Sequence, residues 1–363
     1  MLSADHISKS APLSPAATGA TGASAAGTAR TLYDVTIEVP EGARSGLLGP
    51  AGAGKTTLSA ILGLCEHPDS GVVRVAGTDV AALSPAGRRE WRGAIARVDT
   101  TYVLHPERTA AGNVAAPLER AGFDAPARRR RVAELIDLIG LNRGAAWRPA
   151  ELTEGQRRRV ALARALALRP SVLITDGLTD DLPAEQSGAV LAALDRAWAE
   201  LGVTVLVATT DAGVVRRFCD HVSVLSGGRL LESGSMLELL ADQNSYTARS
   251  VLPAVGHAED LAGFDAVADV VLVGHATVGS LLPDAGARFG VELATLGGGL
   301  TRIGDTPVAR FRLGVTGEQA TAAVRWIGER GGYVSELDPV DTRLPGVHDL
   351  LAEGARELAG TAA

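Results

Sequence analysis

The pattern of apolar and polar positions predicts alternating strands and helices over roughly the first 240 residues. Val172–Thr175 and Val203–Ala208 are short apolar runs of the kind found in buried parallel strands. Thr56–Leu64 is predicted to be a helix, and apolar residues recur at helical spacing within a more helical insertion around 100–165. This alternation favours a doubly wound α/β fold.

A second pattern begins near Val267 and predicts a small separate module. The expected order is strand, helix, two strands, helix and strand, which is the ferredoxin-like unit. The expected elements are the strands Val267–Val273, Leu293–Ile303, Val308–Val315 and Tyr333–Leu337, and the helices Gly279–Phe289 and Glu318–Arg330. The core of this module is expected to contain Phe289, Leu293, Ile303, Phe311, Trp326 and Ile327.

These patterns divide the chain into four expected parts. Residues 1–250 form the first domain, in which 12–30 is a low-complexity insertion of mainly Ala, Gly, Ser and Thr. Residues 251–266 are a linker, 267–340 the ferredoxin-like α+β module, and 341–363 a tail with a helix.

Composition excludes several classes of function. The net charge is −7 and the pI is about 5.6, which argues against a general nucleic-acid or anionic-membrane binder. Two arginine runs, Arg128–Arg131 and Arg157–Arg159, are expected to be solvated helix faces. No stretch approaches the ~20 apolar residues that span a bilayer, so a cytoplasmic protein is expected.

Residues 49–57 match the P-loop pattern G-x-x-x-x-G-K-[ST]. Gly52 and Gly54 are expected to let the backbone curl around a polyphosphate, with Lys55 reaching its β- and γ-phosphates and Thr56 holding Mg²⁺. Lysine occurs elsewhere only at Lys9, among 33 arginines, so a lysine here indicates a site that needs a compact charge. The predicted ATP-binding residues are Gly49, Pro50, Ala51, Gly52, Ala53, Gly54, Lys55, Thr56 and Thr57.

Three later segments follow in the order and spacing of ABC-transporter ATPases. They read LTEGQRRRVALARAL (152–166), VLITDGLTDDLP (172–183) and VLVATTDAGVVRRFCDHVSVLSGGRLLESG (205–234), and they resemble the signature helix, the Walker B strand and the switch region. ERTAAGNVAAPLE (107–119) and the tail ARFGVELATLGGGLTRIGDTPVARFRLGV (287–315) are similar to the ATP-binding subunits of methionine importers.

This resemblance implies a P-loop NTPase fold of the ABC ATPase type with a helical subdomain. It implies a dimer, homomeric or heteromeric, in which each ATP lies between one P-loop and the partner's signature, here Leu152, Thr153, Glu154, Gly155 and Gln156. Asp176 would act with Thr56 at the Mg²⁺ ion. A membrane permease would hold the protein at the inner face of the membrane, and the tail module would bind methionine, with Gly290–Leu296 as the candidate ligand edge.

The sequence departs from the family pattern at the catalytic positions. Gly177 stands where the family has the glutamate that acts as general base, a group typically worth ~10²–10⁴ in rate. Thr210 replaces the switch histidine, Thr100 the Q-loop glutamine, Pro183 an aspartate that faces the partner, and Ala11 the adenine-stacking aromatic residue. Hydrolysis is therefore expected to be weak or absent.

Carboxylates lie beside these vacant positions, so a substitute base remains an alternative. They are Asp99, Asp180, Asp181 and Asp211. Asp99 also stands where the family has an apolar residue, which is expected to weaken docking of the permease.

The signature helix is predicted to be well capped but a poor phosphate site. Thr153 and Gln156 form a capping box, and Glu154 favours the helix dipole. A charged Glu154 would however repel a phosphate ~4 Å away by on the order of 1–4 kcal/mol.

Two functions therefore compete. The first is the ATP-binding subunit of an amino-acid importer, with methionine as the expected substrate. The second is a nucleotide and amino-acid sensor that neither hydrolyses ATP nor works with a permease.

Overall fold

The computed structural model describes residues 1–12, 28–84, 87, 91, 93–242, 244–255 and 263–337. The chain divides into two compact units, the first spanning Met1–Ser233 and the second beginning at Gly234. Each unit has its own hydrophobic core, so we describe them separately. The expected helix in the tail lies outside the described residues.

A six-stranded sheet forms the centre of the first unit, in the order β10-β9-β3-β8-β7-β6. The pairs β3/β8, β3/β9, β7/β8 and β6/β7 are parallel, as the buried apolar runs predict. Every residue of β7 and β8 is buried. The strands are β3 Arg44–Leu48, β6 Ile95–Asp99, β7 Val172–Asp176, β8 Thr204–Thr209, β9 His221–Ser226 and β10 Arg229–Ser235.

A second sheet of the first unit has the order β2-β1-β4-β5 and is antiparallel. Its strands are β1 Leu2–Pro12, β2 Thr28–Val39, β4 Ser70–Val75 and β5 Thr78–Asp79. Thr28–Arg30 belong to β2, so the loop expected over 12–30 is shorter than predicted because pairing with β1 continues to Pro12. Residues 13–27 of that loop lie outside the described residues.

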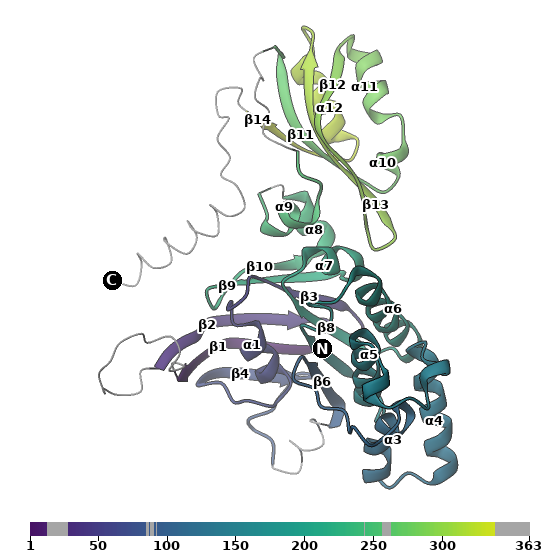
Figure 1. Ribbon diagram of the computed structural model, residues 1–363. Coiled ribbons are helices and arrows are strands. Elements are labelled where there is room, and N and C mark those ends of the chain that lie inside the picture. The colour runs from purple at the N-terminus through teal and green to yellow at the C-terminus, as the bar shows by residue number, and fades with distance from the viewer. Residues whose placement is uncertain are drawn as a thin grey trace, which may run out of the picture. The chain divides into compact units, whose positions relative to one another are not determined.

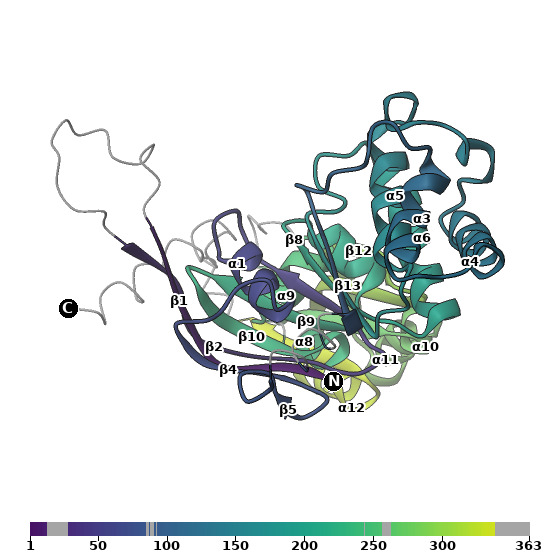
Figure 2. The same ribbon diagram turned by 90° about the horizontal axis from the view of Figure 1, so that it is seen from below.

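Helices α3, α4 and α5 pack on one another and form the helical subdomain expected around 100–165 (Figures 1 and 2). α1 follows the P-loop and packs against β7 and β8. The helices of this unit are α1 Lys55–Leu62, α3 Ala110–Arg120, α4 Ala125–Leu138, α5 Glu154–Ala165, α6 Ala184–Leu201 and α7 Ala212–Phe218, with 3₁₀ turns at Asn142–Gly144 and Pro149–Glu151.

The expectation that both arginine runs are solvated is wrong for one residue of each run. Arg131 is 5% exposed and donates to the carbonyls of Leu166 and Ala167. Arg158 is 8% exposed and lies between α5 and the loop after β7. Both side chains donate hydrogen bonds to backbone carbonyls just after a helix or strand ends. A run of charged residues in the sequence does not reveal this role.

The second unit is the small α+β fold that its pattern predicts. Its sheet has the order β12-β13-β11-β14, with antiparallel pairs and with β12, which contains most of the expected ligand edge, at the side of the sheet. Its elements are β11 Ala266–Val273, α10 His275–Val278, α11 Leu281–Phe289, β12 Glu292–Ile303, β13 Thr306–Thr316, α12 Ala320–Glu329 and β14 Gly332–Leu337, preceded by α8 Met236–Ala241 and α9 Tyr246–Val251.

Of the residues expected in the core of the second unit, Ile327 belongs to its buried cluster, and four others pack against that cluster while partly buried. Ile327 and Ile303 are buried, and Phe289 meets Trp326 edge to face with ring centroids 6.1 Å apart. Leu293 and Phe311 pack against the same core. Among the described residues, no helix combines the length and the apolar character needed to cross a membrane.

Candidate nucleotide-binding site

The predicted site residues meet at one edge of the central sheet. The strands β3, β8, β7 and β6 are neighbours and parallel, so their carboxyl ends lie together. In this register Leu48 lies opposite Thr209, Asp176 opposite Ala208, and Asp99 opposite Asp176. The carboxyl edge of a parallel sheet is where α/β proteins bind ligands.

The P-loop has the backbone that its glycines allow. Gly52 and Gly54 have φ values of 77° and 100°, in the left-handed region. A side chain at Gly54 would also lie 2.8 Å from Leu32 Cδ2 and from the Thr31 carbonyl oxygen, and one at Gly49 would collide with the Leu225 carbonyl. The loop therefore leads into α1 with free N-terminal amides, the arrangement that binds phosphate.

Lys55 lies folded back within this loop. Its ammonium donates to the carbonyls of Gly49 at 2.7 Å and Pro50 at 2.9 Å, and the residue is 8% exposed. Burial lowers the pKa of Lys55, and the carboxylates of Asp180 and Asp176 oppose that shift. A bound polyphosphate would take over hydrogen bonds that the two carbonyls now accept.

Asp176 ends β7 and is paired with a cation of the protein itself. Arg97 Nη2 lies 3.4 Å from Asp176 Oδ2, and Arg97 Nη1 lies 2.5 Å from Asp99 Oδ2. Burial opposes ionisation of Asp99, but hydrogen bonds from Thr101 and the charge of Arg97 outweigh it and lower its pKa. Asp99 is thus held within the site.

The sequence predicts that Thr56 and Asp176 hold a magnesium ion, but their surroundings do not fit one. Thr56 is exposed in the first turn of α1, as such a site requires. Mg²⁺ however needs a carboxylate that is open to the ion or to its waters, whereas Oδ2 of Asp176 already lies 3.4 Å from the guanidinium of Arg97.

Gly177 follows Asp176 in a conformation that suits glycine. Its φ is 66°, and its amide donates to the Ala208 carbonyl at 3.0 Å. A Cβ there would lie 2.9 Å from Thr100 Cγ2 and 3.3 Å from Asp180 Oδ2. The backbone at position 177 therefore disfavours any residue with a Cβ, including the expected glutamate.

Of the four aspartates named as possible substitute bases, Asp180 lies beside Gly177, with its Oδ2 3.3 Å from the place of a Cβ at residue 177. Thr209 donates to Asp180 Oδ1 at 3.1 Å, and burial raises the pKa of Asp180. Asp211 instead accepts from Gly213 N as the N-cap of α7, and Asp99 pairs with Arg97. Asp181 is exposed and has a φ of 59°.

Asp180, Asp181, Thr210 and Asp211 line one open pocket between the loops after β7 and β8. Thr100 lies beside Gly177, and Pro183 is the N-cap residue of α6. Ala11 lies in β1, and its side chain is outside the part that the structure describes.

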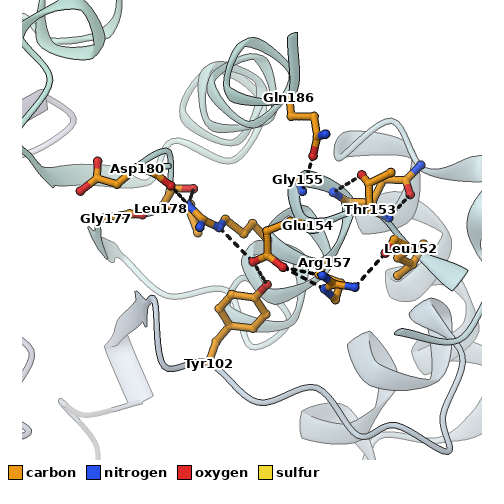
Figure 3. A network of polar contacts seen from close by, with 12 residues as sticks. Tyr102, Leu152, Thr153, Glu154, Gly155, Arg157, Gly177, Leu178, Asp180 and Gln186 are labelled. Atoms are coloured by element: carbon orange, nitrogen blue, oxygen red, sulfur yellow. Dashed lines mark hydrogen bonds and ion pairs between the residues drawn. The ribbon is translucent and has the colours of Figure 1, made fainter. Parts of the chain in front are cut away.

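The signature segment forms the start of α5 with the predicted capping box. Thr153 Oγ1 accepts from Gln156 N, and Gln156 Oε1 accepts from Thr153 N (Figure 3). Leu152 is buried before the cap. Gly155 N donates to Gln186 Oε1 at 2.8 Å, so the side chain of Gln186 in α6 already takes one amide of the first turn.

Hydrogen bonds and ion pairs surround the carboxylate of Glu154 and offset its negative charge (Figure 3). Its carboxylate accepts from Tyr102 Oη at 2.7 Å, from Arg157 Nη2 at 2.7 Å and from Arg158 Nε at 3.2 Å. Burial and Glu154 raise the pKa of Tyr102 to about 12. The repulsion expected between Glu154 and a phosphate is therefore reduced by two guanidinium groups.

Arg158 also holds the loop that contains Gly177. Its Nη1 donates to the carbonyls of Gly177 at 3.1 Å, Leu178 at 3.1 Å and Asp180 at 2.6 Å. Sequence reasoning missed Arg97, Tyr102 and Arg158. Two signals were available. Arg97 and Asp99 are residues i and i+2 of a strand and therefore share a face. Arg157 and Arg158 follow Glu154 by three and four residues in a predicted helix, the spacing of neighbouring side chains.

Comparison with known proteins identifies the family. The family model of ABC transporters matches residues 32–180, and that of the NIL domain matches residues 266–336. The methionine import ATP-binding protein MetN of Thermobifida fusca is 38% identical over 309 residues, 84% of this chain and 94% of that protein. The chain belongs to the MetN family of ABC-transporter ATP-binding proteins.

Other members agree with this assignment. MetN 1 of Rhodococcus jostii is 39% identical over 80% of this chain and 86% of that protein. A dimeric ATP-binding cassette solved in a post-hydrolysis state with ADP and Pi is 28% identical, with a TM-score of 0.56 over 65% of this chain and 98% of that chain. The MetN-family resemblance and the ABC ATPase fold expected from the sequence are confirmed.

Proposed function

We propose that this chain is the ATP-binding subunit of an ABC importer for methionine, and that it binds ATP but hydrolyses it weakly or not at all. The observation that carries nucleotide binding is the P-loop, in which left-handed Gly52 and Gly54 precede Lys55 and the amides of α1. The relatives named as methionine importers support the transport role. None of the relatives reported above favours the alternative of a sensor.

The proposed loss of hydrolysis rests on Gly177. A general base must reach the proton that it abstracts, and residue 177 has no side chain and a backbone that disfavours one. Asp180 is the nearest substitute, but Thr209 and Arg158 hold its carboxyl and its backbone. Magnesium does not enter this proposal because Asp176 is paired with Arg97.

The proposed partners are a permease, through which the chain would be held at the inner face of the membrane, and a second ATP-binding subunit. Within the NIL domain, Gly290–Leu296, which includes the start of the edge strand β12, is the proposed place for methionine.

Equilibrium binding of fluorescent ATP and steady-state hydrolysis by the purified protein test this function. We expect wild-type protein to bind ATP, Lys55→Ala to lose binding at least tenfold, about 1.4 kcal/mol, and neither protein to turn over above background. Turnover that depends on Lys55 would contradict the proposed loss of hydrolysis, and binding that ignores Lys55 would contradict the site.

The transport role needs a separate test. A tagged chain should co-purify with a membrane-spanning permease from detergent-solubilised membranes. Isothermal titration calorimetry should detect binding of methionine to the purified chain. A chain that purifies alone from membranes containing the permease would revive the sensor hypothesis.

A further inference from the structure

Arg97 lies between the two carboxylates at the ends of β6 and β7. It precedes Asp99 by two residues on the same face of β6, and Asp99 is the register partner of Asp176. The guanidinium is 2.5 Å from Asp99 Oδ2 and 3.4 Å from Asp176 Oδ2. One arginine thus bridges two neighbouring strands at the edge that contains the P-loop.

The surroundings hold Arg97 in this position. Its side chain is 16% exposed, and those of Asp99 and Asp176 are 22% and 12% exposed. Its Cδ lies 3.2 Å from the place of a Cβ at Gly63, just after α1, so a larger residue at 63 would press on it. Ion pairs in such places are screened by salt much less than pairs at the surface.

A cation bound at Asp176 would compete with this arginine. Arginine is always protonated in proteins, so its charge does not leave the site with pH. A divalent ion approaching Asp176 would meet a carboxylate already engaged and a positive charge within a few ångström. Mg²⁺ is also held by near-ideal octahedral geometry and dehydrates reluctantly, so it tolerates such a neighbour poorly.

We propose that Arg97 takes the place of the divalent cation at Asp176, so that this chain binds ATP with little dependence on Mg²⁺. The inference rests on the proposed function, because it concerns the same nucleotide site. Lys55, the P-loop amides and the dipole of α1 then supply the positive potential for the phosphates. Arg97 is in this sense a positioning residue that acts through Asp176.

The experiment measures the affinity for a fluorescent ATP analogue in excess Mg²⁺ and in EDTA. For wild-type protein we expect the two dissociation constants to agree within about threefold, under 1 kcal/mol. For Arg97→Met, which frees Asp176 and keeps the chain length, we expect Mg²⁺ to tighten binding at least tenfold, about 1.4 kcal/mol. Arg74→Met, which removes an arginine paired with Asp5 in the other sheet, should behave as wild type.

A second variant guards against misfolding of Arg97→Met. Arg97→Met alone leaves the carboxylate of Asp99 without its partner. The double variant Arg97→Met with Asp99→Leu removes that carboxylate as well and should show the same gain in Mg²⁺ dependence. Wild-type binding that falls tenfold or more in EDTA, or variants whose Mg²⁺ dependence equals that of wild type, would overturn the inference. If wild-type protein binds the ATP analogue no more tightly than Lys55→Ala in either buffer, the proposed function is overturned, and this inference with it.

Discussion

At the scale of single residues, backbone conformation decides as much as side-chain chemistry. Gly177 stands at a catalytic position of the family, and its φ of 66° together with the nearby Thr100 methyl makes glycine the favoured residue. A left-handed conformation costs a residue with a Cβ about 1–2 kcal/mol. Restoring the glutamate would therefore have to overcome strain as well as rebuild a site.

We predict that Gly177→Ala lowers the free energy of unfolding more than Gly202→Ala does. Gly202 ends α6 with the same φ of 66° but has nothing within 4 Å of its Cβ position, so it isolates the conformational cost of about 1 kcal/mol. At Gly177 the contact with Thr100 adds to that cost. Urea unfolding of both variants measures the difference, and equal losses would mean that the loop relaxes around the new methyl group.

Asp180 should make stability depend on pH. Its pKa is raised above 3.8, mainly by burial, so the folded state holds the proton more tightly than the unfolded chain does. The ionised group therefore lowers stability at neutral pH, and that loss disappears as pH falls through the raised pKa and below 3.8. Asp180→Asn, whose amide oxygen still accepts from Thr209, should melt at a higher temperature than wild type at pH 7 but not at pH 3.5.

The opposite pH trend in that comparison would contradict the environment described for Asp180. An Asp180→Asn variant that is less stable than wild type at pH 7 would mean that the charge of Lys55 outweighs burial at this carboxyl. Asp181→Asn, on the exposed neighbour, serves as the matched control.

At the scale of elements, α5 joins the signature segment to the loop after β7. Its first turn is capped by Thr153. Two of its arginines, Arg157 and Arg158, differ in burial and in the carbonyls that they contact. The side chain of Arg157 is 35% exposed, pairs with Glu154 and donates to the carbonyls of Leu152 and Pro149. That of Arg158 is 10% exposed, pairs with Glu154 and donates to three carbonyls of the loop after β7. Arg158 therefore links the helix to this loop.

We predict that two neighbouring arginines of α5 differ sharply on substitution. Arg158→Met leaves carbonyls of Gly177, Leu178 and Asp180 without their donor and should lower the free energy of unfolding by about 2–3 kcal/mol. Arg157→Met removes a more exposed ion pair and the donor to the carbonyls of Leu152 and Pro149, and it should cost less, about 1 kcal/mol. Chemical denaturation measures both, and similar losses would show that the carbonyls find other donors.

At the scale of the whole molecule, two units with separate cores belong to one chain. The P-loop belongs to the first and the NIL domain to the second. A ligand stabilises only the state that it binds, by roughly 2.7 kcal/mol at a hundred times its dissociation constant. Separate cores, together with the two proposed ligand sites, therefore predict that ATP and methionine stabilise different units.

We predict two thermal transitions in calorimetry. ATP should raise the midpoint of one transition and methionine that of the other. Lys55→Ala should abolish the response to ATP and leave the response to methionine unchanged. A single transition raised by both ligands would mean that the two units unfold as one.

Much of the fold follows from local patterns. The strands β7 and β8 appear as apolar runs because both faces of a parallel sheet are covered, and βαββαβ order specifies the second unit. The P-loop is equally local, since its glycines, lysine and helix start are consecutive in the chain. Element ends were less accurate, as the longer strand pairing at Thr28 shows, because a partner strand decides where pairing stops.

The sequence by itself determined the family and the nucleotide-binding loop, because each depends on which residues follow one another, and from Gly177 it predicted the loss of the general base. Only the tertiary structure decided that Arg97 pairs with Asp176, that Tyr102 reaches Glu154 and that Arg158 is buried. Arg97 and Asp176 are 79 residues apart and meet because β6 and β7 pair in register. Charge compensation depends on distance in space, which the order of residues does not contain.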